Sequence, residues 1–228
     1  DWPEMQPLSD DILLKVVSEI HDPVTTTDEL IPSGETSSFR SNPLGLAEFT
    51  LSRKDPAYVG RAKAVRDRSE EVKAEVSRAE KILEEKYLEF KGRIEKAGLG
   101  STIYAVKPGD GSAREQAASC QRVLGASANI ASDYATKRYR SNLINWGMIP
   151  FLYKQGDAAA TENLPFANGD YIFVPGAKKM IAEKLPGVKA YAVRADGTIA
   201  EFDLATGDMT DDERKIIQAG CLINFYRG

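Results

Sequence analysis

Several short stretches of the chain alternate between apolar and polar residues, a pattern that is typical of half-buried β-strands. The clearest is "DILLKVVSEI" (11–20), which is also rich in branched side chains. Further strands are predicted in "STIYAVK", "SANIAS", "MIPFLY" and "ANGDYIFVPGA". "KAYAVRADGTIAEFDL" predicts a hairpin, because Asp196-Gly197 lies between two alternating runs.

The strongest helical pattern covers residues 61–97. Apolar side chains recur there every three or four positions, with charged residues between them: Val72, Val76, Ala79, Leu83, Tyr87, Phe90 and Ile94. This spacing predicts one amphipathic helix about 50 Å long, ended by Gly98 and Gly100 and packed on its own domain. A coiled-coil arm for a partner is the alternative, but the stripe is not a strict heptad.

Other helices are predicted near 113–124, in "YATKRYRSNLINW" and in "TDDERKIIQAGCLINFY", where Thr210 is a natural N-cap; "LAEFTLSR" suggests a short one. Strands and helices interleave, so the fold class is α/β. No break in composition divides the chain, so one domain is expected over residues 1–228. Residues 21–45 are polar and show neither the periodicity of a helix nor that of a strand. We expect a long loop there, and such loops are often functional.

Composition and charge narrow the function. The 228 residues include 30 basic and 34 acidic side chains, which gives no electrostatic basis for binding nucleic acid. No apolar run approaches the roughly 20 residues of a membrane helix, and the N-terminus lacks the pattern of a signal peptide. No membrane partner is expected, and the composition suits the cytoplasm. Cys120 and Cys221 are expected to be small buried residues, and His21 has no histidine or cysteine beside it. We therefore expect no metal site made wholly by this chain.

A glycine turn in "KPGDGSAREQAASCQRVLG" (107–125) leads through Ser112 and Arg114 into a helix. Glycines allow the backbone to approach a ligand closely, and the free N–H groups of a helix start stabilise an anion. Arg114 would add a planar donor for a carboxylate. Ser112 as a simple N-cap is the alternative. A phosphate-binding loop is disfavoured because no Gly-Lys-Ser/Thr follows.

A second polar segment, "TTTDELIPSGETSSFRSNP", places Asp28 and Arg40 twelve residues apart. A solvated loop with a surface ion pair would explain the two charges. The hydroxyl groups around them favour a polyoxygenated ligand instead: Thr25, Thr26, Thr27, Ser37, Ser38 and Ser41.

Taken in order, "TTTDELIPSGETSSFRSNPLG", "GDGSAREQAA" and "NLINWGMIPF" resemble the swivelling C-terminal domain of the aconitase superfamily. The most specific match is the family pattern Gly-Ser-Ser/Ala-Arg-Glu followed by a helix of small residues. The resemblance runs from about residue 11 to the C-terminal helix and implies a swivelling domain of the β/β/α type. It also implies a hydro-lyase that dehydrates and rehydrates a small hydroxy-polycarboxylic acid.

Carried over position by position, the resemblance makes Ser112 the base that removes a proton and gives Asp28 a supporting role in catalysis. The residues it assigns to substrate binding are Arg114, Arg40, Ala113, Thr27 and Ser38. It implies no cofactor on this chain and a [4Fe-4S] cluster on domains 1–3 of the same polypeptide or on a large subunit. The chain alone would then be an incomplete enzyme, and its start without methionine favours a fragment. Small subunits of isopropylmalate isomerase share the fold but are usually shorter, and nothing in the sequence favours them.

Three positions depart from the family pattern. Glu29 and Gln116 stand where aconitases have histidines, and Tyr139 lies near a third histidine position. These changes suggest a divergent, bacterial-type hydratase that acts on a different acid. A hypothesis of another class is a non-catalytic interaction module that uses the helix at 61–97, which would leave the apolar stripe of that helix exposed.

Overall fold

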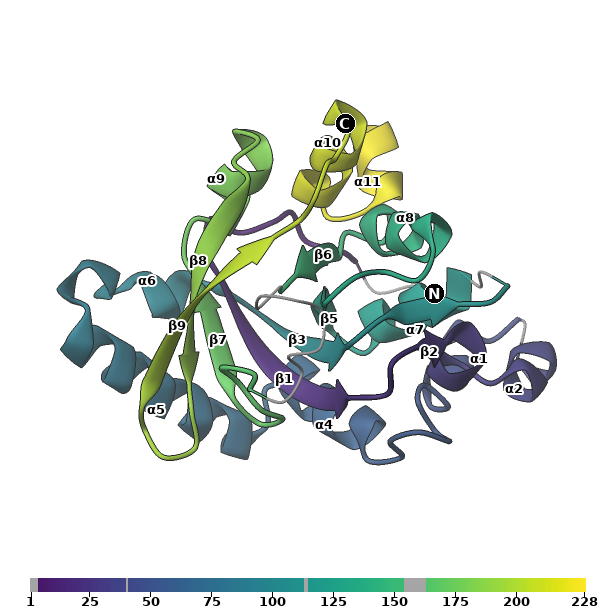
Figure 1. Ribbon diagram of the computed structural model, residues 1–228, viewed down its shortest axis with the longest axis horizontal. Coiled ribbons are helices and arrows are strands. Elements are labelled where there is room, and N and C mark those ends of the chain that lie inside the picture. The colour runs from purple at the N-terminus through teal and green to yellow at the C-terminus, as the bar shows by residue number, and fades with distance from the viewer. Residues whose placement is uncertain (1–3, 40, 113–114, 154–162) are drawn as a thin grey trace.

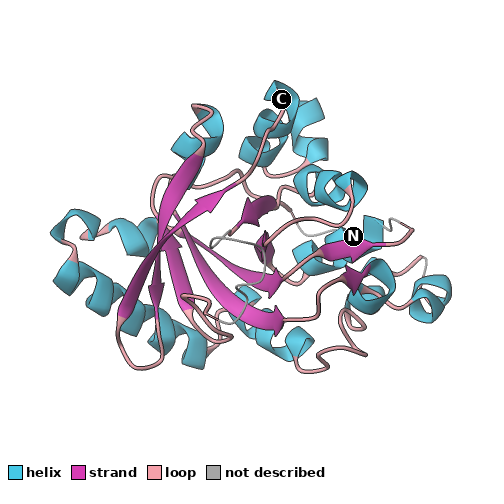
Figure 2. Ribbon diagram, in the orientation of Figure 1, coloured by secondary structure: helices cyan, strands magenta, loops and turns pink. Residues whose placement is uncertain are grey.

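Seven strands form a closed barrel in the computed structural model, which describes residues 4–39, 41–112, 115–153 and 163–228. The strand order around the barrel is β1-β3-β5-β6-β9-β8-β7, with helices outside it (Figures 1 and 2). The strands are β1 (Ile12–Ile20), β3 (Gly98–Ala105), β5 (Ala126–Ala131), β6 (Ile149–Leu152), β7 (Tyr171–Val174), β8 (Gly187–Val193) and β9 (Ile199–Ala205). The predicted α/β class and the predicted strands are confirmed.

The barrel has a parallel half and an antiparallel half, which meet at β6 and again at β1. This strand pairs in parallel with β3 and antiparallel with β7. Ile20 is the register partner of Ala105, and Ala105 is the register partner of Ala131. Strands β1, β3 and β5 therefore end side by side, and the loops that follow them leave from one edge of the sheet.

The side chains of β1 divide the apolar core into an inner and an outer part. Ile12, Leu14 and Val16 belong to the cluster that contains the interior side chains of the other strands. Leu13 points the other way and packs with the helical segment 70–96. Full burial of an aliphatic side chain stabilises a fold by about 1.5–3 kcal/mol, so this alternation holds β1 in register.

The prediction of a single helix over residues 61–97 is wrong. The segment forms α4 (Tyr58–Arg66), α5 (Glu70–Lys86), the 3-10 turn η1 (Leu88–Phe90) and α6 (Arg93–Lys96). Arg68 adopts a φ of 50°, and the Ser69 hydroxyl then accepts a hydrogen bond from the Val72 N–H as the cap of α5. The apolar residues keep a helical spacing across this break, and the sequence pattern therefore predicts a continuous helix.

The apolar face of α5 is covered. Ala79 and Leu83 are buried with Phe90 and Ile94 against β1, β7 and β8. Such burial is the opposite of the exposed stripe that an interaction module based on this helix requires. The structure thus gives that alternative no support.

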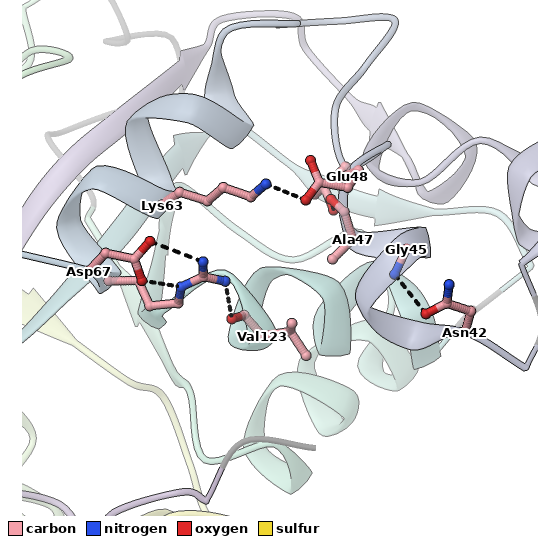
Figure 3. A network of polar contacts seen from close by, with 9 residues as sticks. Asn42, Gly45, Ala47, Glu48, Lys63, Asp67 and Val123 are labelled. Carbon is pink, nitrogen blue, oxygen red and sulfur yellow. Dashed lines mark hydrogen bonds and ion pairs between the residues drawn. The ribbon is translucent and has the colours of Figure 1, made fainter. Parts of the chain in front are cut away.

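The polar segment 21–45 is not an irregular loop as predicted. It contains β2 (Thr25–Thr26), α1 (Thr27–Leu30), α2 (Ser33–Ser38) and α3 (Pro43–Ala47). These elements are too short for periodicity to reveal. Lys63 on α4 pairs with Glu48 just after α3, while Arg66 donates a hydrogen bond to the Val123 carbonyl (Figure 3).

The remaining helices are α7 (Glu115–Val123), α8 (Lys137–Asn145), α9 (Ala177–Ala182), α10 (Asp211–Ala219) and α11 (Leu222–Arg227). Thr210 caps α10 as predicted, in a reciprocal capping box with Glu213. The predicted C-terminal helix is divided in two, because Gly220 adopts a φ of 100°. None of the helices in the described ranges has the length and hydropathy of a membrane span.

We expect Gly147→Ala to destabilise the fold severely. Gly147 has a φ of 78°, and a Cβ there would lie 1.8 Å from the Gly220 carbonyl oxygen. Gly169→Ala is the matched control, since its φ is 99° but nothing lies within 4 Å of an added Cβ. The control should lose about 1–2 kcal/mol for its backbone conformation alone. Urea unfolding should show a further loss of about 1–3 kcal/mol for Gly147→Ala. Equal losses in the two variants would contradict the close contact.

Candidate functional site

The two polar segments singled out in the sequence lie side by side in the structure. β2 pairs in parallel with β4 (Pro108–Asp110), with Thr25 opposite Pro108 and Thr26 opposite Asp110. The Thr25 N–H also donates to the Lys107 carbonyl oxygen at 3.0 Å. This two-stranded sheet extends from the edge of the barrel where β1 and β3 end (Figure 1).

A side-chain hydrogen bond joins the segments at the predicted catalytic serine. The hydroxyl of Thr27, which is buried, donates to the Ser112 carbonyl oxygen at 2.9 Å. Ser112 itself is exposed, and Gly111 before it adopts a φ of 105°. The structure thus presents Ser112 at the surface, close to the start of α7. Ala113 and Arg114 lie outside the described residues.

The glycine turn before Ser112 rests on an aromatic ring. Gly109 has a φ of 98°, and a Cβ there would lie 2.4 Å from Cγ of Tyr139. The Thr136 hydroxyl donates to the Gly109 carbonyl oxygen at 3.0 Å, and it also caps α8 by accepting from the Tyr139 N–H. Only glycine fits this position, because both the conformation and the contact exclude a side chain.

Tyr139 belongs to a buried polar network beneath this turn. Its hydroxyl donates to Asn129 Oδ1 at 2.6 Å and accepts from Gln121 Nε2 at 2.9 Å. Asn129 Nδ2 donates to Gln121 Oε1 at 2.8 Å, which closes the ring of contacts. Burial raises the pKa of Tyr139 well above its ordinary value, so the phenol stays protonated. Tyr139 therefore supports the loop from the core.

Asp28 lies on α1, directly after Thr27. Its Oδ1 accepts a hydrogen bond from the Ser33 N–H at 2.9 Å, and its Oδ2 lies 3.7 Å from Arg53 Nη1. Arg53 also lies 3.8 Å from Glu35 and is largely exposed. Arg53 was not predicted as part of the site, although the basic pair in "LSRKD" directly after the polar segment indicates a positive charge there.

Glu29, one of the three departures from the family pattern, is engaged within its own helix. Its carboxylate accepts from the Thr26 N–H at 3.1 Å in a capping box and lies 3.2 Å from Lys54. Burial opposes ionisation of Glu29, but the hydrogen bonds from Thr26 and Lys54 hold its pKa below the usual range. Glu29 is thus a structural carboxylate here.

Of the two remaining predicted residues, Ser38 is described by the structure and Arg40 is not. The Ser38 hydroxyl donates to the Gly34 carbonyl oxygen at 3.1 Å within α2, and Ser38 is exposed. Arg40 lies outside the described residues. The structure brings Thr27 into contact with Ser112, whereas the carboxylate of the adjacent Asp28 bonds the Ser33 N–H and lies near Arg53.

Neither cysteine suits a metal. Cys120 and Cys221 are both buried, and burial raises the pKa of the Cys120 thiol to about 12. A thiol that stays protonated is a poor metal ligand, because the thiolate is the binding form. Over the ranges that the structure describes, no group of three or more histidine, cysteine or acidic side chains gathers as a metal site.

Comparisons with known proteins agree with this architecture. Residues 61–156 match the family model of the aconitase C-terminal domain. The chain is 28% identical to aconitate hydratase A of Rickettsia bellii over 129 residues, and 29% identical to that of Corynebacterium jeikeium over 118 residues. These alignments cover 56% and 51% of this chain but only 14% and 12% of the relatives, so the match spans a small part of their length.

A solved structure shares the fold over nearly the whole chain. It is 3-isopropylmalate dehydratase from Methanocaldococcus jannaschii, with a TM-score of 0.56 and 20% identity. The superposition covers 95% of this chain and 93% of that one, so the two chains are of similar length.

We expect the stabilisation contributed by Glu29 to depend on pH. Its folded-state pKa lies below the ordinary glutamate value of about 4.3. The contribution is therefore fully present above that value and is lost as the pH falls through the folded-state pKa. Glu29→Gln should cost about 0.5–1 kcal/mol of unfolding free energy at pH 7 and much less at pH 3. Glu183→Gln, at an exposed position, is the control. A cost for Glu29→Gln that does not change with pH would exclude this role.

Proposed function

Because this chain carries a C-terminal domain of the aconitase superfamily, we propose that it is the swivelling catalytic domain of a hydro-lyase. The reaction is the dehydration and rehydration of a hydroxy-polycarboxylic acid. The observation that carries the proposal is the hydrogen bond from Thr27 to the Ser112 carbonyl oxygen. It joins the two loops that contain all the residues assigned to the reaction.

Ser112 is the proposed base that removes a proton from the carbon next to the hydroxyl-bearing carbon. A serine hydroxyl does not ionise unaided near neutral pH, so the base needs a positive environment. Exposure of Ser112 gives a substrate access, and the start of α7 supplies N–H groups and a partial positive charge. Arg114, two residues later, adds a full charge. These are the groups that favour an alkoxide.

The other loop contributes charge and position. Arg40 and Arg114 are the proposed carboxylate-binding residues, with the planar donor geometry that such groups require. Thr27 holds the loop, since its buried hydroxyl is already engaged with Ser112. Asp28 supports the acid–base network, and Arg53 lies beside its carboxylate. Ser38 and Ala113 remain proposed contacts to the substrate.

A [4Fe-4S] cluster held by other domains would bind the substrate hydroxyl and one carboxylate. This chain offers that cluster no ligands in the proposal, since its two cysteines are buried and Cys120 is held protonated. Reaction therefore needs a partner that carries the cluster. That partner is either the remainder of a longer polypeptide or a separate large subunit.

The substrate is proposed to differ from that of aconitase itself. Where the family pattern has a histidine, Glu29 is engaged with Thr26 and Lys54, and Tyr139 is engaged in the core. Neither side chain is free to replace an imidazole in proton transfer. An acid with different carboxylate spacing is the expected substrate class.

The test is to reconstitute the chain with its cluster-bearing partner and assay it without oxygen against a panel of hydroxy-acids. The partner is found from the native reading frame and its neighbours. Formation of an unsaturated acid, detected by its ultraviolet absorbance, supports the proposal. A reconstituted, cluster-loaded complex that dehydrates no member of the panel contradicts it.

Replacing Ser112 with alanine in that complex should lower kcat by about 10²–10⁴-fold, because the proton acceptor is lost. KM should change little, since Ser112 is not assigned to substrate holding. Ser77→Ala, at an exposed position on α5, is the control and should retain full activity. Equal losses in affinity and turnover would instead assign Ser112 to binding.

Replacing Arg40 with lysine should raise KM by about tenfold and leave kcat within a few fold. Lysine keeps the charge but cannot make the two parallel hydrogen bonds of a guanidinium to a carboxylate. Arg78→Lys on α5 is the matched control, because Arg78 is exposed and donates a hydrogen bond to the Ala195 carbonyl oxygen. An unchanged KM in Arg40→Lys would remove Arg40 from the site.

A further inference from the structure

The turn that ends at Ser112 depends on its neighbours for a fixed conformation. Gly109 and Gly111 within it adopt φ values of 98° and 105°. Glycine takes such values without strain, but it also has the most backbone freedom of any residue, so a single conformation must be stabilised by contacts from outside the turn. The contacts that hold this turn therefore also fix the position of Ser112.

Two threonine hydroxyls hold the turn from opposite sides. β1 and β5 both pair in parallel with β3 and flank it, so the segments that follow these two strands lie on either side of the turn that follows β3. On the β1 side, the Thr27 hydroxyl donates to the Ser112 carbonyl oxygen at 2.9 Å. On the β5 side, the Thr136 hydroxyl donates to the Gly109 carbonyl oxygen at 3.0 Å. The two accepting carbonyls are only three residues apart.

Thr136 is itself held in place by the helix that it begins. Its hydroxyl oxygen accepts a hydrogen bond from the Tyr139 N–H at 3.1 Å as the N-cap of α8. The single O–H of this hydroxyl is then directed to the Gly109 carbonyl oxygen. The residue before it adds a backbone contact, since the Ala135 N–H donates to the Pro108 carbonyl oxygen at 2.9 Å. One half-buried side chain thus joins the start of α8 to the turn.

We propose that Thr136 is a positioning residue for Ser112 and acts through the Gly109 carbonyl oxygen, with Thr27 as its counterpart on the other side of the turn. This inference rests on the proposed function, in which Ser112 is the base. A base must lie within hydrogen-bond reach of the proton that it removes, and a displacement of about 1 Å can lower the rate about 10²-fold. Thr136 is not among the residues assigned to substrate binding, so its loss should lower turnover and leave affinity nearly unchanged.

Three substitutions separate the bond to the turn from the cap of α8. Serine can make both hydrogen bonds, ionised aspartate caps a helix but can only accept, and valine makes neither bond. In the reconstituted complex, Thr136→Val and Thr136→Asp should lower kcat about 10- to 100-fold, while the KM of Thr136→Val stays within about threefold. Thr136→Ser should keep kcat near the wild-type value. Full turnover in the valine or aspartate variant, or a serine variant as slow as the valine variant, overturns the proposal.

Thr210→Val is the matched control for the lost helix cap. Thr210 begins α10 as Thr136 begins α8, because its hydroxyl accepts from the Glu213 N–H at 3.1 Å, and Thr210 is exposed. Both valine variants should lower the unfolding temperature, but only Thr136→Val should lower kcat. An equal loss of kcat in the two variants would assign the effect to general stability and overturn the proposal.

NMR relaxation of the ¹⁵N-labelled 228-residue chain distinguishes failure of this inference from failure of the proposed function. The backbone order parameters of Gly111 and Ser112 should fall in Thr136→Val and Thr136→Asp and remain near the wild-type values in Thr136→Ser and Thr210→Val. Unchanged order parameters in the first two variants overturn the hold of Thr136 on the turn. A wild-type complex that dehydrates no acid, in a chain whose order parameters respond as expected, contradicts the proposed function and leaves that hold supported.

Discussion

The parallel register of β1 and β3 is the constraint on which the rest of the structure depends. Ile20 and Ala105 are partners in this register, so both chains leave the sheet at neighbouring points. That proximity lets residues 25–26 and 108–110 pair as a second, smaller sheet. It also brings the Thr27 hydroxyl to the Ser112 carbonyl oxygen across 85 residues of sequence. A shift of one residue would turn the side chains of β1 to the wrong face and separate the loops.

Long or strongly patterned elements were predictable from the sequence. The strand at 11–20, the Asp196-Gly197 hairpin and the Thr210 cap all depend on local patterns that tertiary contacts reinforce. The break at Arg68 was not found, because the apolar spacing continues in phase on both sides of it. The short helices in residues 25–47 were not predicted, for another reason. Four to six residues are too few for a period of 3.6 to appear.

The candidate site was predictable as residue types but not as contacts. The glycine turn before Ser112 was visible, whereas its support by Tyr139 required the fold, since α8 approaches from 30 residues further along the chain. Glu29 shows the limit most clearly. In the sequence it is a substitution for a histidine, and in the structure it is a helix cap paired with Lys54. A residue name at a family position does not reveal which neighbours have already engaged it.

Helix α7 connects the two ends of the domain, and buried polar contacts fix its orientation. Its core-facing residues include Ala117, Ala118 and Cys120, which are small and hold a helix only loosely against rotation. Gln121 adds directional hydrogen bonds, which these small side chains cannot make. It bonds Tyr139 on α8 and Asn129 on β5, and both partners are fully buried.

Unsatisfied, these groups would each cost about 1–3 kcal/mol, so alternative rotations of the helix are disfavoured. The contacts among Gln121, Asn129 and Tyr139 thereby fix the orientation of α7 against α8 and β5. Buried polar contacts and the apolar packing around them thus act together to hold the helix that follows Ser112.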